Sequence, residues 1–209
     1  MTHATTVGIR CDAGPRTGVG HLVRCVALAE ELTARGADVH FLSDLGGVAW
    51  AGAQLEQRGL PWHPAPYDEV GLVAAVERLA LDALVVDSYT LPPSHSKAVR
   101  ATGRTVLAIV DGDPRGQDAD IYVDQNLDAA LDSGDVRLAG LDYALLRSSV
   151  RRLRPLAAPV QTNARTPKVV AFFGGTDAYR AAPQVARLLT DAAVPFEATV
   201  VAADASLRA

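Results

Sequence analysis

The sequence is poor in cysteine, methionine and aromatic residues. Its 209 residues include two cysteines, one methionine and 5% aromatic residues. Cys11 and Cys25 belong to no Cys-x-x-Cys motif and no histidine-rich cluster, so we predict two small, buried, reduced residues and no metal site. The alternative is a disulfide between them, but an unexported protein stays in a reducing compartment, where disulfides are rare.

Long apolar runs and an excess of basic residues are also missing. No apolar run approaches the roughly 18 residues needed to cross a bilayer, and the first residues lack the basic segment and apolar stretch of a signal peptide. The net charge of −4 argues against a nucleic-acid-binding protein, because such proteins present a basic face. We therefore expect a soluble, cytoplasmic protein that binds neither nucleic acid nor a membrane.

The sequence does contain a regular alternation of predicted strands and helices. Short apolar runs predict strands, and apolar residues at helical spacing predict helices between them. The predicted strands cover residues 6–11, 37–42, 60–63, 83–87, 105–110 and 121–124, and the predicted helices cover 19–34, 50–58 and 69–81. This alternation indicates an α/β fold with a doubly wound, Rossmann-like parallel sheet.

Polar side chains follow the carboxyl ends of several predicted strands. Ligands of doubly wound sheets bind at that edge. The side chains expected to gather there are Asp12, Asp87, Ser88, Tyr89, Asp111 and Asp113. For Asp111 and Asp113, capping of the next turn is an equal alternative. This convergence is the first indication of a site.

The composition changes after residue 147. Residues 148–167 are rich in arginine, proline and alanine, which is typical of a linker. A second strand, glycine turn, helix and strand follow at 168–173, 174–177, 180–193 and 196–201. Roughly 40 residues bury too little surface to be stable alone. We therefore predict an N-terminal domain at 1–147, a linker, and part of a second Rossmann-like domain at 168–209.

The glycine-rich stretch after the first strand has the form of a phosphate-binding loop. Unpaired backbone N–H groups at a helix N-terminus bind anions, and Gly18 and Gly20 lie where the first helix begins. No Gly-Lys-Ser/Thr follows, which excludes a Walker loop. Val23 replaces the third glycine of a dinucleotide fingerprint, so that interpretation, with Asp44 as the ribose-binding acid, is the weaker alternative.

Five segments in order extend this pattern along the chain. They are Arg10-x-Asp12 with Gly18-x-Gly20-His21-x-x-Arg24-Cys25, followed by residues 85–89, 107–113, 140–147 and 173–177. Together they resemble the nucleotide-sugar hydrolase family of the pseudaminic acid pathway. That family cleaves UDP-2,4-diacetamido-2,4,6-trideoxy-β-L-altropyranose to the free sugar and UDP.

The resemblance implies two Rossmann-like domains, as in B-type glycosyltransferases, with a UDP-sugar bound in the cleft between them and no cofactor. It implies that His21 acts as the base and that Tyr89 contacts the sugar. The turn that would help to hold the diphosphate is Gly174-Gly175-Thr176-Asp177. The family binds uridine mainly through later parts of the second domain, so we expect weak or no hydrolysis by residues 1–209 alone.

The residues themselves suit the hydrolysis of a sugar–phosphate bond, which needs a base for water and N–H dipoles for the leaving diphosphate. The positive end of the helix dipole tends to keep His21 neutral and able to accept a proton. Asp12 could hold the ring, and Arg24 could meet Asp12 or a phosphate. The predicted substrate-binding set is Gly18, Gly20, Arg24, Asp87 and Tyr89, together with residues 174–177.

Three alternatives stay open at this point. The structural alternative is that His21 only caps the turn and Arg24 pairs with a surface acid. A glycosyltransferase of the same fold would use His21 to deprotonate a sugar acceptor instead of water. A non-catalytic sugar-nucleotide-binding module would keep the fold without the reaction. The identity of the sugar and the oligomeric state do not follow from the sequence.

Overall fold

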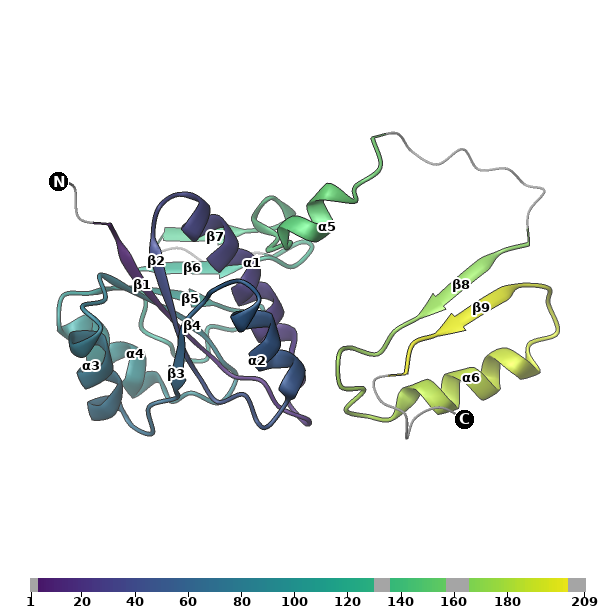
Figure 1. Ribbon diagram of the computed structural model, residues 1–209, viewed down its shortest axis with the longest axis horizontal. Helices are drawn as coiled ribbons and strands as arrows, with labels where there is room; N and C mark the ends of the chain where they lie inside the picture. Colours follow the sequence, from purple (N-terminus) through teal and green to yellow (C-terminus); the bar gives the residue numbers. More distant parts are fainter. Residues whose placement is uncertain (1–3, 130–135, 157–165, 203–209) are drawn as a thin grey trace.

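The computed structural model of the chain describes residues 4–129, 136–156 and 166–202 (Figure 1). Residues 157–165 of the predicted linker and residues 203–209 of the predicted second domain lie outside the described residues. No helix in the described ranges combines the length and the apolar character that a bilayer crossing needs.

A seven-stranded parallel sheet forms the larger unit of the molecule. Its strands are β1 (Thr6–Cys11), β2 (Asp38–Ser43), β3 (Trp62–Pro64), β4 (Ala83–Asp87), β5 (Thr105–Ile109), β6 (Ile121–Asp124) and β7 (Val136–Ala139). Their order in the sheet is β3-β2-β1-β4-β5-β6-β7, and each neighbouring pair is parallel. The order reverses between β1 and β4, which is where doubly wound sheets bind ligands.

Helices cover both faces of this sheet (Figure 1). They are α1 (Gly20–Ala34) and α2 (Ala49–Glu56) on one face, and α3 (Glu69–Arg78) and α4 (Pro93–Ala101) on the other. This arrangement confirms the predicted Rossmann-like, doubly wound α/β fold. All six residues of β1 are buried, as a central strand covered on both faces requires.

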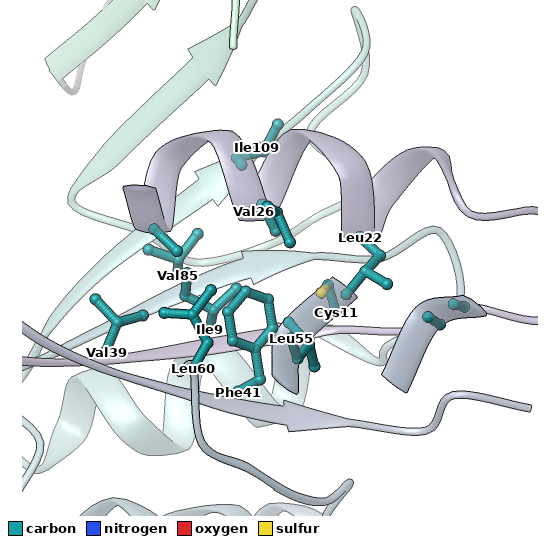
Figure 2. Close-up of a cluster of buried hydrophobic side chains, with 14 of the residues drawn as sticks. Ile9, Cys11, Leu22, Val26, Val39, Phe41, Leu55, Leu60, Val85 and Ile109 are labelled. Carbon is teal, nitrogen blue, oxygen red and sulfur yellow. The ribbon is translucent and has the colours of Figure 1, made fainter. Parts of the chain in front are cut away.

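Two apolar clusters hold the helices to the sheet. Figure 2 shows the first, in which Leu22 of α1 and Leu55 of α2 lie near Phe41 and Ile9 of the sheet. The second cluster lies on the opposite face and includes Leu72 of α3. These leucines, Phe41 and Ile9 are fully buried, and each such side chain stabilises the fold by about 1.5–3 kcal/mol.

Two elements of the larger unit are missing from the sequence prediction. Helix α4 begins at a proline and carries the polar sequence PSHSKAVRA, of which Val99 packs in the second cluster. Strand β7 is a half-buried edge strand of four residues. Both elements are too short or too polar to produce a clear apolar period, so tertiary packing defines them.

The predicted linker begins with a short helix, α5 (Ser148–Arg152), which follows a 3-10 turn at Leu141–Tyr143. The backbone N–H of Ser148 donates to Glu30 of α1 at 2.7 Å, and Arg151 lies 3.5 Å from Glu31. The first part of the predicted linker is therefore ordered against α1.

A smaller unit follows, formed by β8 (Lys168–Ala171), α6 (Ala181–Asp191) and β9 (Glu197–Val200). The two strands are parallel and make a separate two-stranded sheet (Figure 1). This strand, turn, helix and strand match the predicted beginning of a second Rossmann-like domain. The domain boundaries themselves stay a prediction.

Candidate functional site

The β1–α1 loop is closed by reciprocal backbone hydrogen bonds between Gly14 and Gly18, at 3.0 and 2.8 Å. Gly18 has φ +76°, a conformation that favours glycine. Helix α1 follows at Gly20, and its N-cap is Val19, whose side chain offers no hydrogen-bond acceptor. The first backbone N–H groups of α1 therefore have neither an intrahelical partner nor a side-chain cap, and no acidic residue lies in the first turn.

His21 lies in this first turn, between a carboxylate and a phenol ring. Its Nδ1 is 3.8 Å from Oδ1 of Asp87, which is fully buried at the end of β4. Its ring packs edge-on against Tyr89, with 4.4 Å between the ring centroids. His21, Asp87 and Tyr89 thus lie together at the carboxyl edge of the sheet.

Arg24, one turn further along α1, binds two carboxylates. Its Nε and Nη2 donate to the two oxygens of Asp87, both at 2.6 Å. Its Nη1 and Nη2 donate to Asp111 at 2.8 and 3.2 Å. The guanidinium is thus occupied by acids, as the structural alternative for Arg24 proposes, except that Asp87 is a buried acid and not a surface one. Among the described residues, the hydrogen-bond partners of Arg24 are Asp87 and Asp111, not Asp12.

The network continues from Asp111 to Tyr89, which the sequence predicts, and to Asn126 and Asp124, which it does not. The phenol of Tyr89 and the side-chain amide of Asn126 both donate to Asp111. Asn126 also donates to Asp124 at 2.8 Å, and Asp124 accepts the backbone N–H of Gly112 at 2.7 Å. Asp124 ends β6. An acid at the end of an apolar strand is the sequence signal that could have identified it as a site residue.

These contacts shift three pKa values, in directions that keep Arg24 and Asp111 charged and Tyr89 neutral. Burial raises the pKa of Asp111, but hydrogen bonds from Arg24 and Tyr89 outweigh it and lower the pKa to about 2. Burial lowers the pKa of Arg24, and the hydrogen bonds to Asp87 and Asp111 outweigh it, so the pKa is raised. The hydrogen bond to Asp111 raises the pKa of Tyr89. Tyr89 therefore stays protonated and Asp111 stays ionised at neutral pH.

Other predicted edge residues shape the turns around this network. Ser88 accepts the backbone N–H groups of Thr90 and Leu91 at 3.2 and 3.1 Å. Asp113 accepts the N–H of Arg115 at 2.8 Å. It therefore caps the turn after β5, which is the alternative that the sequence left open for Asp113. The guanidinium of Arg115 lies over the Tyr89 ring, 4.5 Å from its centroid.

The two cysteines behave as predicted: both are free and buried. The thiol of Cys25 donates to Asp87 at 3.4 Å, and burial raises the pKa of Cys25. In the described part of the chain, no group of three or more His, Cys, Asp or Glu side chains is arranged to hold a metal ion.

Asp12 lies apart from His21, which corrects one prediction. Its carboxylate pairs with Arg10 and accepts the backbone N–H of Asp44 at 2.9 Å. Arg10 belongs to β1 itself, and Asp44 follows β2, which lies on the opposite side of β1 from β4. The carboxylate within ion-pair distance of His21 is Asp87. The prediction placed Asp12 beside His21 because it ends the preceding strand, but the strand end is also adjacent to the β2–α2 loop.

The second glycine turn approaches the first one. A Cβ atom added to Gly175 would lie 2.4 Å from Cγ2 of Val19, and one added to Gly18 would lie 3.9 Å from Oγ1 of Thr176. The loop after β8 therefore contacts the start of α1. That the two turns belong to one site stays a prediction. Gly174 has φ +73° in this turn.

Asp177 has a structural role in that turn. Its two oxygens accept the backbone N–H groups of Ala181 and Ala182 at 2.7 and 3.0 Å, and its side chain is buried. Asp177 thus caps the N-terminus of α6 with a negative charge. The N-terminus of α1 has no such cap, so the two helix starts differ in their capacity for an anion.

A cavity of about 800 Å³ opens at the carboxyl ends of β1, β2 and β3. Arg10, Asp12 and Asp44 line it from the sheet side, and Glu56 lines it from α2. It was not predicted from the sequence, because its walls come from loops whose shape leaves no periodic signal.

Comparisons with known proteins support the fold. No family model and no curated protein sequence matches the chain. Among solved structures, MurG from Acinetobacter baumannii aligns with a TM-score of 0.61 and 16% identity, covering 94% of this chain and 60% of that one. The glycosyltransferase SnogD from Streptomyces nogalater aligns with a TM-score of 0.56 and 12% identity, covering 98% of this chain and 68% of that one. The chain thus spans 60% of the length of the MurG structure, and its fold is the B-type glycosyltransferase-like fold predicted from the sequence.

Proposed function

We propose that this chain carries the base-bearing half of an enzyme that cleaves a UDP-linked sugar to free sugar and UDP. The observation that supports this most directly is His21 at an uncapped helix start, 3.8 Å from the buried carboxylate of Asp87 and edge-on to Tyr89. The sugar class is the one that the sequence resemblance implies, an amino-deoxy sugar linked to UDP.

In the proposed reaction, His21 removes a proton from water. Nδ1 of His21 faces Asp87, which leaves Nε2 for the water. The water oxygen forms a bond to the anomeric carbon, the bond from that carbon to the phosphate oxygen breaks, and UDP leaves with the electron pair. The imidazolium that forms lies beside Asp87, whose negative charge stabilises it.

The leaving diphosphate would be bound by backbone N–H groups. The start of α1 offers such groups at the positive end of the helix dipole. Gly175 lies against Val19 and Thr176 lies near Gly18, so this turn would add N–H groups from the second unit. In this proposal Asp177 fixes the turn through its bonds to α6 and does not bind the phosphate itself. Gly18 and Gly20 belong to this diphosphate-binding loop, and Tyr89 would contact the sugar, as the resemblance implies.

The experiment is an assay of UDP release from UDP-2,4-diacetamido-2,4,6-trideoxy-β-L-altropyranose by the complete natural protein. We expect His21→Asn to lower the rate by about 10²- to 10⁴-fold, because a positioned base contributes that much. The matched control is His40→Asn, since His40 lies in β2 and contacts His63 at 3.2 Å, away from Asp87. Undiminished UDP release by His21→Asn would contradict the proposed role.

A glycosyltransferase is the second candidate, and the likeness to a structure described as a glycosyltransferase favours it. In that reaction His21 would deprotonate a sugar hydroxyl instead of water. Incubation with the UDP-sugar alone separates the two, because a strict transferase releases UDP only when an acceptor sugar is added. Binding of UDP measured by calorimetry without any UDP release would instead favour a non-catalytic module.

A further inference from the structure

Arg115 is a cation beside the His21 network whose charge no carboxylate of the described residues neutralises. It lies in the loop between β5 and β6, with its guanidinium over the ring of Tyr89, 4.5 Å from the ring centroid. The neighbouring Asp113 accepts the backbone N–H of Arg115 and not its guanidinium. Nε of Arg115 is buried, so a ligand can reach only the terminal nitrogens Nη1 and Nη2, which have no acceptor among the described residues. Such a guanidinium is suited to an anionic part of a ligand.

The backbone around Arg115 is fixed. A tight turn runs from Pro114 to Gln117, and the backbone N–H of Gln117 closes it by donating to the oxygen of Pro114 at 2.9 Å. Arg115 has φ +51° in this turn, a conformation that is uncommon for residues other than glycine. The buried side-chain amide of Gln117 donates to the backbone oxygen of Leu91 at 2.7 Å. The turn is thus anchored to the segment before α4, and it presents Arg115 from a defined position.

The charges of the neighbouring network are unfavourable for a phosphate without a further cation. Asp87 and Asp111 carry two negative charges, and Arg24, which pairs with both, supplies one positive charge. Tyr89 adds no charge, because its hydrogen bond to Asp111 raises its pKa. The network alone therefore repels an incoming diphosphate. Arg115 offsets this repulsion, since its charge lies on the ring of Tyr89.

The ring of Tyr89 also connects Arg115 to the proposed base. His21 packs edge-on against this ring, with 4.4 Å between the ring centroids, and the guanidinium of Arg115 contacts the same ring. In the proposed reaction, the water held by His21 attacks the anomeric carbon. The β-phosphate of UDP is bonded to that carbon through a single oxygen. It is therefore the anionic group of the substrate that lies closest to the reacting carbon and to His21.

We propose that Arg115 binds the β-phosphate of the UDP-linked sugar through its terminal nitrogens. As the bond between the anomeric carbon and the phosphate oxygen breaks, negative charge grows on the β-phosphate, and the guanidinium stabilises it. This role rests on the proposed function for the identity of the ligand, and it adds a residue of the loop between β5 and β6 to the substrate-binding set.

Calorimetry with UDP and UMP tests this role in the complete natural protein, because the two nucleotides differ by the β-phosphate. We expect Arg115→Gln to weaken UDP binding by about tenfold or more, as the loss of a hydrogen bond to a charged group does. UMP binding should change by less than about twofold. Arg115→Lys keeps the charge but not the planar pair of donors, so it should weaken UDP binding by only about threefold.

The matched control is Arg35→Gln, which removes one positive charge at the opposite end of α1 from His21. Arg35 pairs with Glu31, and its side chain is 74% exposed. This variant should leave the affinities for UDP and UMP within about twofold of the native values. In the UDP-release assay, Arg115→Gln should also lower the rate at saturating UDP-sugar by about tenfold, because the contact strengthens as the bond breaks.

Unchanged UDP binding in Arg115→Gln, equal weakening of UDP and UMP, or an equal effect of Arg35→Gln would overturn the proposal. UDP release by the native protein together with any of these results refutes the role of Arg115 and leaves the proposed function standing. UDP binding that depends on Arg115, without release of UDP from the sugar nucleotide, refutes hydrolysis and leaves the role of Arg115 standing. Absence of UDP binding by the native protein would overturn both.

Discussion

The two sides of β1 use polar residues in opposite ways at the same edge of the sheet. On the β4–β6 side, Arg24, Asp87 and Asp111 are bonded to one another and largely buried. On the β1–β3 side, a cavity of about 800 Å³ is lined by acids, by Arg10 and by two aromatic side chains. The first arrangement places Asp87 and Tyr89 against His21, the proposed base, whereas the second leaves an open cavity.

The difference arises from how many partners each arginine has. Arg24 makes four hydrogen bonds to two carboxylates, which fixes its orientation. Arg10 pairs with one carboxylate through Nη1 and leaves Nε unpaired. A fully bonded network favours rigidity, and an unpaired buried donor is costly.

The largest expected effect comes from removing the arginine of each side. Arg24→Met would leave Asp87 buried without its cationic partner, which should lower the free energy of unfolding by about 3–5 kcal/mol. The matched variant Arg10→Met frees Asp12, which is partly exposed, and should cost about 1 kcal/mol. Urea unfolding of both variants measures the difference. Equal losses would show that the two sides do not differ as described.

Gly46 lies where the β2–α2 loop packs on the β1–α1 loop, and a substitution there can disrupt this packing. Its φ is +55°, and a Cβ atom there would lie 2.7 Å from the carbonyl oxygen of Ala13 and 2.8 Å from Cα of Gly14. Gly46→Ala should lower the free energy of unfolding by about 3 kcal/mol, through backbone strain together with the clash.

Gly47→Ala is the control for this prediction. Its φ is +72°, but a Cβ atom there meets no atom within 4 Å, so only the backbone strain of about 1–2 kcal/mol applies. Thermal unfolding of the two variants gives the comparison. If Gly47→Ala were as destabilising as Gly46→Ala, the packing of the β2–α2 loop on the β1–α1 loop would not explain the loss.

The smallest expected effect is a pH dependence on the His21 side. The pKa of Asp111 is lowered from 3.8 to about 2 in the folded protein, so its contribution is complete above pH 3.8 and is lost as the pH falls toward 2. That contribution is about 1 kcal/mol, discounted because the carboxylate is partly exposed. Unfolding measured between pH 5 and 2 should show a smaller acid loss in Asp111→Asn than in Asp44→Asn. The opposite order would contradict the prediction.

Much of the larger unit follows from its sequence because each central strand is a buried apolar run. The strands at 6–11, 83–87 and 121–124 have the predicted bounds, and the parallel, doubly wound sheet follows from their alternation with helices. Helix α4 could not be predicted in the same way, because only part of one face is buried and the rest is polar.

The candidate site was predictable where a residue ends a strand or begins a helix. His21, Asp87, Tyr89 and Asp111 come together as expected. The partner of His21 was wrongly assigned to Asp12, because the sequence does not show which neighbouring strand a loop faces. The order of the strands decides this, since β4 brings Asp87 beside α1 and β2 draws Asp12 to the cavity side.

The most direct test of the account compares Asp87→Asn with Asp12→Asn in the UDP-release assay with the complete natural protein. Both substitutions keep the shape of the side chain and remove one carboxylate charge. We predict a loss of about 100-fold for Asp87→Asn, because His21 loses the charge that stabilises its protonated form. Asp12→Asn should stay within about twofold of the native rate. A larger loss for Asp12→Asn than for Asp87→Asn would contradict the assignment of chemistry to the β4–β6 side.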